Sequence, residues 1–230
     1  MTEITITPLT GIPEVRPGDD LAGLLGDAVA RAGGLAEGDV LAVAHKVVSK
    51  AEGRIVGADD ELAVVLREAR TVRRRRGDLV IAETAHGFVC AGAGVDHSNA
   101  PRAGWVVLLP EDPDASARGL RAALAGRFGV APAVVVSDSF GRAWRNGTTD
   151  VAIGVAGLSP LLDLRGTADA AGRTLGSTVV AVADELAGAA ELAMGKAAGI
   201  PAARIRGYAV PPGDGSARDL VMPRRRDLFP

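Results

Sequence analysis

The sequence has few of the residues from which cross-links, stacking surfaces and membrane spans are built. Cys90 is the only cysteine among 230 residues, and aromatic residues make up 3%. A single cysteine excludes an intrachain disulfide, which is typical of a protein in a reducing cytosol. The scarcity of aromatic rings argues against binding single-stranded nucleic acid by stacking. No apolar run approaches the roughly 20 residues needed to span a bilayer. We therefore expect a cytoplasmic protein without a membrane segment.

An excess of charge of either sign is also lacking. The chain has 26 basic and 28 acidic residues, so its formal net charge is -2, which requires neither nucleic acid nor an anionic membrane as a partner. The local exception is the run Arg73-Arg74-Arg75-Arg76. It follows an amphipathic helical pattern, which favours a solvated helix end, with a phosphate site as the alternative. The first residues show no basic region followed by an apolar stretch, so no signal peptide is expected.

The common signatures of nucleotide-binding folds and hydrolases are absent. No Gly-rich loop ends in Gly-Lys-Ser/Thr, and no dinucleotide fingerprint follows a predicted strand. No Gly-x-Ser-x-Gly elbow is present either. Cys90 lies in the apolar, strand-like stretch 87–91, which favours a buried, inert thiol over a nucleophile. Any site must therefore be built from other polar residues.

The residues that are present form a pattern of mixed helices and strands. Hydrophobic residues make up 47% of the chain, enough for one large core or a core with a smaller lobe. Consecutive strands without intervening helices, from 79 to 109 and from 151 to 182, imply antiparallel pairing. We predict an α+β fold with mixed sheets in a single domain over 1–230. The predicted helices span 20–32, 61–75, 113–128, 184–198 and 216–221, and the predicted strands span 4–8, 40–48, 79–83, 87–91, 105–109, 133–137, 151–155, 161–164, 178–182 and 203–206.

Two segments have residues suited to a nucleotide. The loop 11–20 is held by Gly and Pro before a helix; it is either an ordinary connection or a rigid cover for a nucleotide base. The segment 45–54 follows a predicted buried strand and contains His45, Lys46 and Lys50. A lysine ammonium and a serine hydroxyl suit a polyphosphate, whereas the alternative is a solvated loop.

Two further segments have residues suited to a metal ion. In 92–99, small residues let the backbone approach a ligand closely, and Asp96 offers the oxygen ligands that Mg²⁺ or Mn²⁺ prefers; a plain turn is the alternative. In 134–150, a β-branched strand runs into a predicted loop rich in donors. Asp138 stands at the end of the strand, and Arg142 and Arg145 are able to neutralise a phosphate or carboxylate. The alternative there is a structural ion-pair network. Residues 204–208 form a weaker basic candidate.

These segments together resemble the coenzyme F-420-0:L-glutamate ligase (gamma-glutamyl ligase) family. The likeness covers nearly the whole chain and is most specific in the string Gly141-Arg142-Ala143-Trp144-Arg145-Asn146-Gly147. The chain is especially similar to the ligase part of the actinobacterial form, which is often fused to a C-terminal nitroreductase-like domain. The resemblance implies that this chain is a stand-alone ligase or an isolated N-terminal part, without a P-loop, acting as a homodimer.

The resemblance also implies the site. One or two divalent cations, Mg²⁺ or Mn²⁺, would be held by Asp96, Asp138 and Ser139, with K⁺ as an additional candidate ion. Their own chemistry, rather than the resemblance, leads us to expect that Arg142 and Arg145 act in catalysis by steering the anionic precursor or glutamate. Relatives often have Ser in place of His45 and Thr in place of Ser139. The expected GTP-binding residues are Ile12, Pro13, Glu14, Val15, His45, Lys50, Asn99, Arg206, Gly207 and Tyr208.

The expected reaction joins L-glutamate to the coenzyme F-420 precursor through an amide bond. The precursor carboxylate would attack the γ-phosphorus of GTP, and the glutamate amine would attack the resulting acyl phosphate, with further γ-linked glutamates as an extension. This requires Asp96 and Asp138 to meet around a cation that binds the terminal phosphates. The alternatives are a metal-dependent phosphohydrolase and a non-catalytic nucleotide-binding subunit.

Overall fold

The computed structural model describes residues 3–228, so the predicted domain 1–230 extends two residues beyond it at each end. A five-stranded mixed sheet has the strand order β1-β12-β2-β8-β9. Only β2 and β8 pair in parallel; the other neighbours are antiparallel. The α+β class predicted from the sequence is confirmed. The strands of this sheet are β1 (Thr5–Pro8), β2 (Val40–Ala44), β8 (Ala133–Arg142), β9 (Arg145–Ala156) and β12 (Ala202–Arg206).

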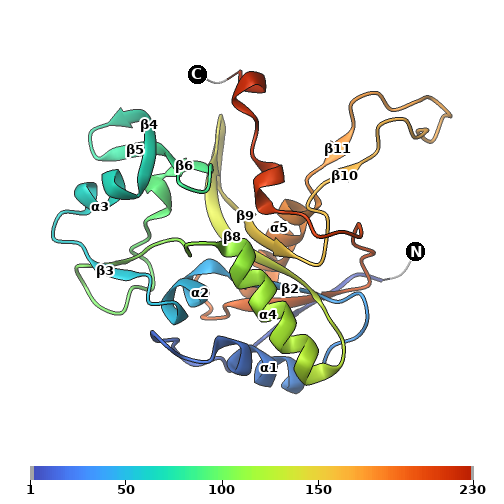
Figure 1. Ribbon diagram of the computed structural model, residues 1–230, viewed down its shortest axis with the longest axis horizontal. Coiled ribbons are helices and arrows are strands. Elements are labelled where there is room, and N and C mark those ends of the chain that lie inside the picture. The colour runs from blue at the N-terminus through green and yellow to red at the C-terminus, as the bar shows by residue number, and fades with distance from the viewer. Residues whose placement is uncertain (1–2, 229–230) are drawn as a thin grey trace.

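Helices cover both faces of this sheet (Figure 1). Along β2, Leu41 and Val43 pack with the helices α1 (Leu21–Arg31) and α4 (Pro113–Phe128). Val40 and Ala42 point to the opposite face and pack with α5 (Val182–Met194). This alternation is the period of two expected for a strand, and the apolar character of both sets explains why the strand reads as a continuous hydrophobic run.

A smaller lobe is built from the middle of the chain (Figure 1, upper left). It contains β4 (Ala69–Arg76), β5 (Leu79–Thr84) and β6 (Val89–Ala91), which form an antiparallel sheet beside α3 (Glu61–Glu68). A second pair joins β3 (Ile55–Gly57) to β7 (Trp105–Val107). Cys90 is buried in β6, as predicted.

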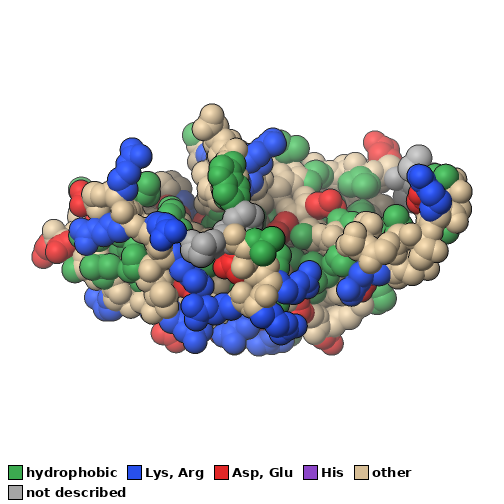
Figure 2. Space-filling view, turned by 90° about the horizontal axis from the view of Figure 1, so that it is seen from above, with side chains coloured by type: hydrophobic (Ala, Val, Ile, Leu, Met, Phe, Trp, Pro, Cys, Tyr) green, Lys and Arg blue, Asp and Glu red, His purple; other side chains and the backbone are tan. Residues whose placement is uncertain are grey.

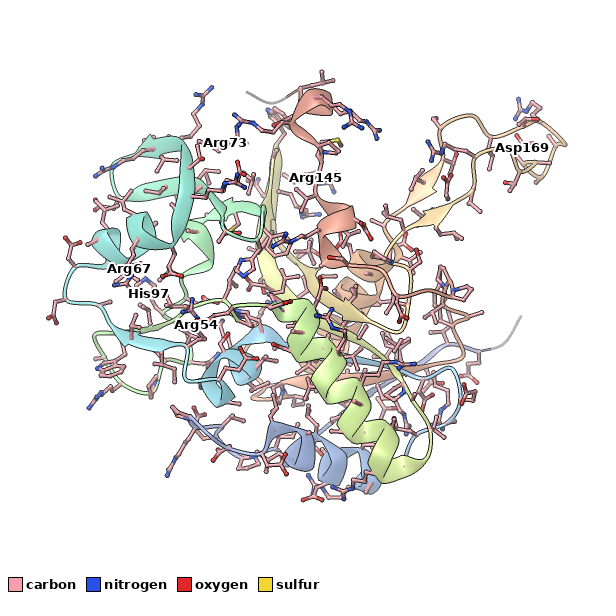
Figure 3. All side chains as sticks on the ribbon, in the orientation of Figure 1. Arg54, Arg67, Arg73, His97, Arg145 and Asp169 are labelled. Atoms are coloured by element: carbon pink, nitrogen blue, oxygen red, sulfur yellow. The ribbon has the colours of Figure 1, made fainter. Side chains whose placement is uncertain are left out.

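A two-stranded arm extends from the other side of the main sheet. Its strands are β10 (Leu162–Asp163) and β11 (Val179–Val180), and its tip contains Asp169 (Figure 3). Figure 2 shows the arm from above, at the right of the view. No helix within residues 3–228 is both long enough and apolar enough to cross a membrane.

The predicted helix over 61–75 is wrong in its second half. Helix α3 ends at Glu68, and residues 69–76 form strand β4, including the Arg run. A helix would place Arg70 beside Arg73 and Arg74 on one face, where like charges repel. In the strand, Arg73 instead pairs with Glu83 of β5 at 2.7 Å. The Arg run is therefore part of an exposed strand rather than a helix end.

Three other predicted elements differ in type from the elements observed. The predicted strand 40–48 ends at Ala44, and α2 (His45–Ala51) follows directly, because a short apolar run alone does not distinguish strand from helix. The donor-rich stretch after 137, predicted as a loop, continues as a long hairpin of β8 and β9. The predicted helix 216–221 is a single 3₁₀ turn, η2 (Ala217–Leu220), with Ser216 and Asp219 forming a capping box.

Candidate active site

The cleft lies at the carboxyl ends of the two parallel strands. β2 and β8 are in register, with Ala44 opposite Ser137, so the next residues, His45 and Asp138, emerge side by side. Ligand sites in sheets of this kind are commonly found at such strand ends. The cavity there has a volume of about 280 Å³ and is also bordered by the loop before α1 and by the segment that follows α5.

Asp96 reaches the same place from the smaller lobe. Its backbone is fixed by a two-way bridge to Val107: the Asp96 N–H donates to Val107 O at 2.9 Å, and the Asp96 carbonyl oxygen accepts from the Val107 N–H at 2.8 Å. The turn that precedes it needs glycine at position 94. Gly94 has a φ of +73°, and a Cβ there would lie 2.6 Å from the Leu109 side chain.

Asp96 and Asp138 are far apart in the sequence, and in the structure the ring of His45 lies between their carboxylates. Its Nε2 lies 3.3 Å from Asp96 Oδ2 and 3.2 Å from Asp138 Oδ1. One ligand atom from each of the three residues falls within 4.8 Å of the others. Two carboxylates and an imidazole are a donor set that fits a divalent cation. Asp96 and Asp138 thus meet, as the sequence-based hypothesis required.

His45 is charged in this arrangement. Burial opposes the charged ring, but the carboxylates of Asp138 and Asp96 outweigh that effect and raise the pKa of His45 to about 9. Burial raises the pKa of Asp96, but hydrogen bonding to His45 and the charge of Lys46 outweigh it and lower this pKa to about 2. The imidazolium therefore supplies positive charge between the two carboxylates when no metal is bound.

Two lysines of α2 add positive charge to the cleft. Lys46 Nζ lies 2.9 Å from Asp96 Oδ2 and donates to Ser98 Oγ at 2.6 Å. Lys50 is almost fully buried, and its Nζ lies 2.5 Å from Glu14 Oε1 in the loop before α1. Neither ammonium makes the two-pronged contact of a guanidinium, and each sits on a flexible stem that allows it to turn toward an anionic ligand.

A second polar cluster adjoins the first through Ser139. Asp150 is buried on β9 and accepts hydrogen bonds from Ser137 Oγ at 2.9 Å and Ser139 Oγ at 2.7 Å. Lys196, just beyond the end of α5, donates to the same carboxylate at 2.6 Å. Sequence reasoning did not single out Asp150 or Lys196 as site residues, because the hairpin pairing and the turn after α5 bring them here.

Most residues expected to bind GTP do line the cleft. They are Ile12, Pro13, Glu14, Val15, His45, Lys50 and Asn99. Asp138 and Ser139 border it too, and both also line a smaller adjoining hollow that contains Asp96. Lining residues that the sequence-based hypothesis left out include Lys46, Asp150, Glu191, Met194, Lys196 and Pro201. Of these, only Lys46 was named from the sequence, in the segment 45–54 that follows the predicted buried strand.

The two arginines expected to act in catalysis lie on the exposed end of the β8–β9 hairpin. Arg142 donates to the Asn146 carbonyl at 3.3 Å, and Arg145 lies toward the top of the hairpin in Figure 3. Neither lines the cleft. Arg142 follows Gly141, which borders the smaller hollow. Their role in steering an anionic substrate stays a prediction. His97 is also exposed and pairs with Glu61 of α3.

Arg206, Gly207 and Tyr208 lie at the opposite end of the sheet. Strand β12 begins beside Pro201 at the cleft and runs away from it, so that Arg206 pairs with Asp39 at the start of β2. A five-residue strand separates the two ends by roughly 15 Å. Within one chain these three residues are not brought to the cleft, and their contact with GTP stays a prediction.

The fold and the site together describe a class of protein: a mixed α+β protein whose acidic, lysine-lined cleft is suited to a divalent cation and an anionic ligand. The particular family follows from sequence comparison. The model of the F420-0:Gamma-glutamyl ligase family matches residues 11–207, and the chain belongs to this family.

Curated relatives are similar over most of their length. A protein of Methanopyrus kandleri named coenzyme F420:L-glutamate ligase is 44% identical, with 98% of this chain and 97% of the relative covered. The protein of the same name from Methanothermobacter thermautotrophicus is 42% identical, with 98% of each chain covered. The one from Methanocaldococcus jannaschii is 40% identical, with 84% of this chain and 85% of the relative covered.

Proposed function

We propose that this chain is a GTP-dependent ligase that joins L-glutamate to the coenzyme F-420 precursor through an amide bond. Membership of the ligase family and the names of its relatives support the two substrates. The observation that carries the chemistry is the meeting of Asp96 and Asp138 around His45 at the edge of a lysine-lined cleft. This arrangement suits a cation and a polyphosphate together.

The reaction needs activation because a carboxylate does not release oxide to an amine. In the first step, a precursor carboxylate oxygen forms a bond to the γ-phosphorus of GTP, the bond to the β–γ bridging oxygen breaks, and GDP leaves. In the second step, the α-nitrogen of glutamate attacks the acyl carbon and phosphate leaves with the proton that the nitrogen loses. Phosphoryl transfer of this kind depends mainly on positioning and on neutralising charge.

The side chains of the cleft match these requirements. Asp96 and Asp138, with His45, would hold a divalent cation, which when bound draws charge from phosphate oxygens. Lys46 and Lys50 are placed to exchange their carboxylate partners for phosphate oxygens. The half-buried Ile12 and the buried Val15 give the loop before α1 an apolar side beside the polar one. That combination is what a nucleotide base and its phosphates need.

The decisive experiment is incubation of the purified chain with precursor, L-glutamate, GTP and Mn²⁺, followed by product mass and GDP measurement. We expect a product heavier by one or more glutamate residues, with one GDP formed for each. GDP formed without precursor and glutamate would instead indicate a phosphohydrolase. No product from the purified chain, despite bound GTP, would indicate a non-catalytic nucleotide-binding subunit.

The finer parts of the hypothesis are proposed with the same reaction. They are the acyl phosphate, the homodimer, the additional K⁺ and the successive addition of glutamates. The acyl phosphate has a direct test: a precursor labelled with ¹⁸O in its carboxylate should transfer one labelled oxygen to the released phosphate. Unlabelled phosphate would exclude this route.

A further inference from the structure

The outer end of the β8–β9 hairpin has a tryptophan that the cleft does not use. Trp144 is 80% exposed, and it lies in the string 141–147 that is most specific in the family likeness. The other tryptophan of the chain, Trp105, is half-buried in β7, with the Arg102 guanidinium 4.1 Å from the centre of its ring. Tryptophan is a highly buried residue on average, so the exposure of Trp144 is unusual.

The backbone at Trp144 is one that a bulky residue rarely adopts. Residues 143 and 144 form the turn between the two strands, and Trp144 has a φ of +56°. Glycine or asparagine is favoured in this left-handed conformation, whereas a large side chain is strained there. Strained positions of this kind cluster at ligand-binding sites. The requirements of the turn therefore do not explain why this residue is a tryptophan.

The hairpin connects this tryptophan to the two carboxylates of the cation site. Asp138 and Gly141 lie on β8, and both line the smaller hollow, which also contains Asp96. Beyond Ser137 the strand continues past the end of β2 (Figure 1). It spans roughly 13 Å between Asp138 and the turn. A molecule that lies along the hairpin would thus have one end at the carboxylates and the other at the Trp144 ring.

The charges beside the tryptophan are positive. Arg142 and Arg145 flank the turn as partners in the hairpin register, and both are exposed. Figure 3 shows Arg145 toward the outer end of the hairpin. From 139 to 149 the hairpin has no acidic residue. An indole stacks on flat rings and guanidinium groups attract phosphate or carboxylate, so this end suits a ligand that is both aromatic and anionic.

The precursor of the proposed reaction combines these groups. It has a flat deazaflavin ring at one end and the reacting carboxylate at the other, joined by an extended chain. We propose that Trp144 binds the deazaflavin ring of the precursor by stacking, while the carboxylate lies in the hollow beside Asp96 and Asp138. This inference rests on the proposed function for the identity of the substrate. It adds the residue that recognises the ring.

Contact between Trp144 and the ring is measured through the fluorescence of the deazaflavin. An indole stacked on the excited ring quenches it by electron transfer, which requires contact. We expect the fluorescence lifetime of the bound precursor to fall severalfold in the wild type and to stay near that of the free precursor in Trp144→Gly. Trp105→Phe, the matched change at the other tryptophan, should quench as the wild type does.

A truncated precursor separates ring binding from a structural role of Trp144. It keeps the carboxylate end and has a methyl group in place of the ring and the chain next to it. For the full precursor, Trp144→Gly should raise KM about tenfold with little change in kcat, because stacking is lost. For the truncated precursor, the variant and the wild type should have the same KM. An equal rise with both substrates would assign Trp144 to the shape of the hairpin and overturn the proposal.

Two controls complete the test. Glycine suits the left-handed backbone at position 144, so Trp144→Gly is expected to fold, and thermal unfolding checks this. Light scattering measures its oligomeric state, which should equal that of the wild type. A changed state would assign the exposed ring to an interface between copies of the chain and overturn the proposal, as would an unquenched deazaflavin in the wild type.

Failure of this inference is distinguishable from failure of the proposed function. A chain that quenches the bound precursor through Trp144, yet forms no amide product, keeps the ring site and loses the ligase. A chain that forms the product with an unchanged KM in Trp144→Gly keeps the ligase and loses the ring site.

Discussion

The main sheet has buried charges at both of its ends, and the two ends are built differently. At the start of β2, Asp39 is fully buried and receives two hydrogen bonds from Arg206, at 2.7 and 2.6 Å. At the far end of the same strand, Asp138 and Asp96 share the single ring of His45, and Lys46 contacts Asp96 through one ammonium. Both ends neutralise carboxylates, but only the second lies in a cleft.

The difference separates a structural ion pair from a site. The two-pronged guanidinium satisfies both oxygens of Asp39 and leaves them little capacity for a ligand. Burial alone would raise the pKa of Asp39, but its pairing with Arg206 lowers it, which stabilises the charged form. In the cleft, the carboxylates pair with an imidazolium, which is able to lose its proton, and with lysine side chains, which are able to move away. The cleft therefore has carboxylates that are able to exchange their partners for a metal ion.

The largest effect is expected at the cleft end. Asp138→Asn removes one charge from the cation site while keeping the shape of the side chain. We expect ligation to fall by about 10³-fold, since a charge that stabilises the phosphoryl transfer is lost. Amide product formation measures this, with thermal unfolding as the check that the fold is intact. Near-normal GDP release by this variant would contradict the assignment.

The matched change at the other end should act on stability instead. Asp39→Asn removes the carboxylate that pairs with Arg206 and whose charge also acts on the buried Arg204, and we expect a loss of about 3 kcal/mol in the free energy of unfolding. Urea unfolding measures it. The fraction that remains folded should ligate at the normal rate. A loss of activity with unchanged stability would place the Arg206 end in the reaction, as the family resemblance suggested.

The pH dependence of metal binding tests the cleft through His45. Its pKa of about 9 means that a proton must leave before the ring binds a metal. Affinity for Mn²⁺ should therefore rise about tenfold per pH unit up to pH 9 and then level off. In the metal-free protein, the raised pKa stabilises the fold fully below pH 6.5, and this contribution is lost as the pH rises through about 9.

Calorimetric titration with Mn²⁺ between pH 6 and 10 measures this slope. His45→Gln is the matched control, because it keeps a neutral polar group and removes the titration. We expect its affinity for Mn²⁺ to be weaker at high pH and nearly flat across the range. The same slope in both proteins would show that another group controls the binding.

The smallest effect is expected for the exposed hairpin. Replacing both Arg142 and Arg145 by Ala removes two charges near the mouth of the smaller hollow. If they steer the anionic precursor, its KM should rise about tenfold while kcat changes little. Steady-state kinetics with varied precursor measures this. An unchanged KM would assign both arginines to the surface alone.

The sequence predicted well those parts of the main sheet that depend on the pattern of residues within a single strand or helix. The continuous apolar runs of β2 and β8 are visible without a structure, and so is the apolar face of α1. The conversion of 69–76 into a strand was not visible, since it depends on pairing with β5. Helix α2 was missed because its His and Lys residues follow an apolar run that continues into Val47 and Val48.

For the site, the sequence indicated which residue types carry the chemistry more readily than it indicated which side chains lie beside one another. Asp96 and Asp138 were singled out by residue type and family resemblance, and the parallel register of β2 and β8 brings His45 between them. The role of Asp150 depends on a hairpin register that no local pattern specifies. The position of Lys196 depends on where α5 ends. Long-range pairings of this kind arise from the fold as a whole.

The most direct test of the account is a crystal structure with Mn²⁺ and the β,γ-imido analogue of GTP, using the anomalous signal of manganese. The account predicts a manganese peak bound by Asp96 and Asp138, with the terminal phosphate of the analogue beside it. A manganese peak elsewhere, or a nucleotide bound away from these two carboxylates, would contradict it.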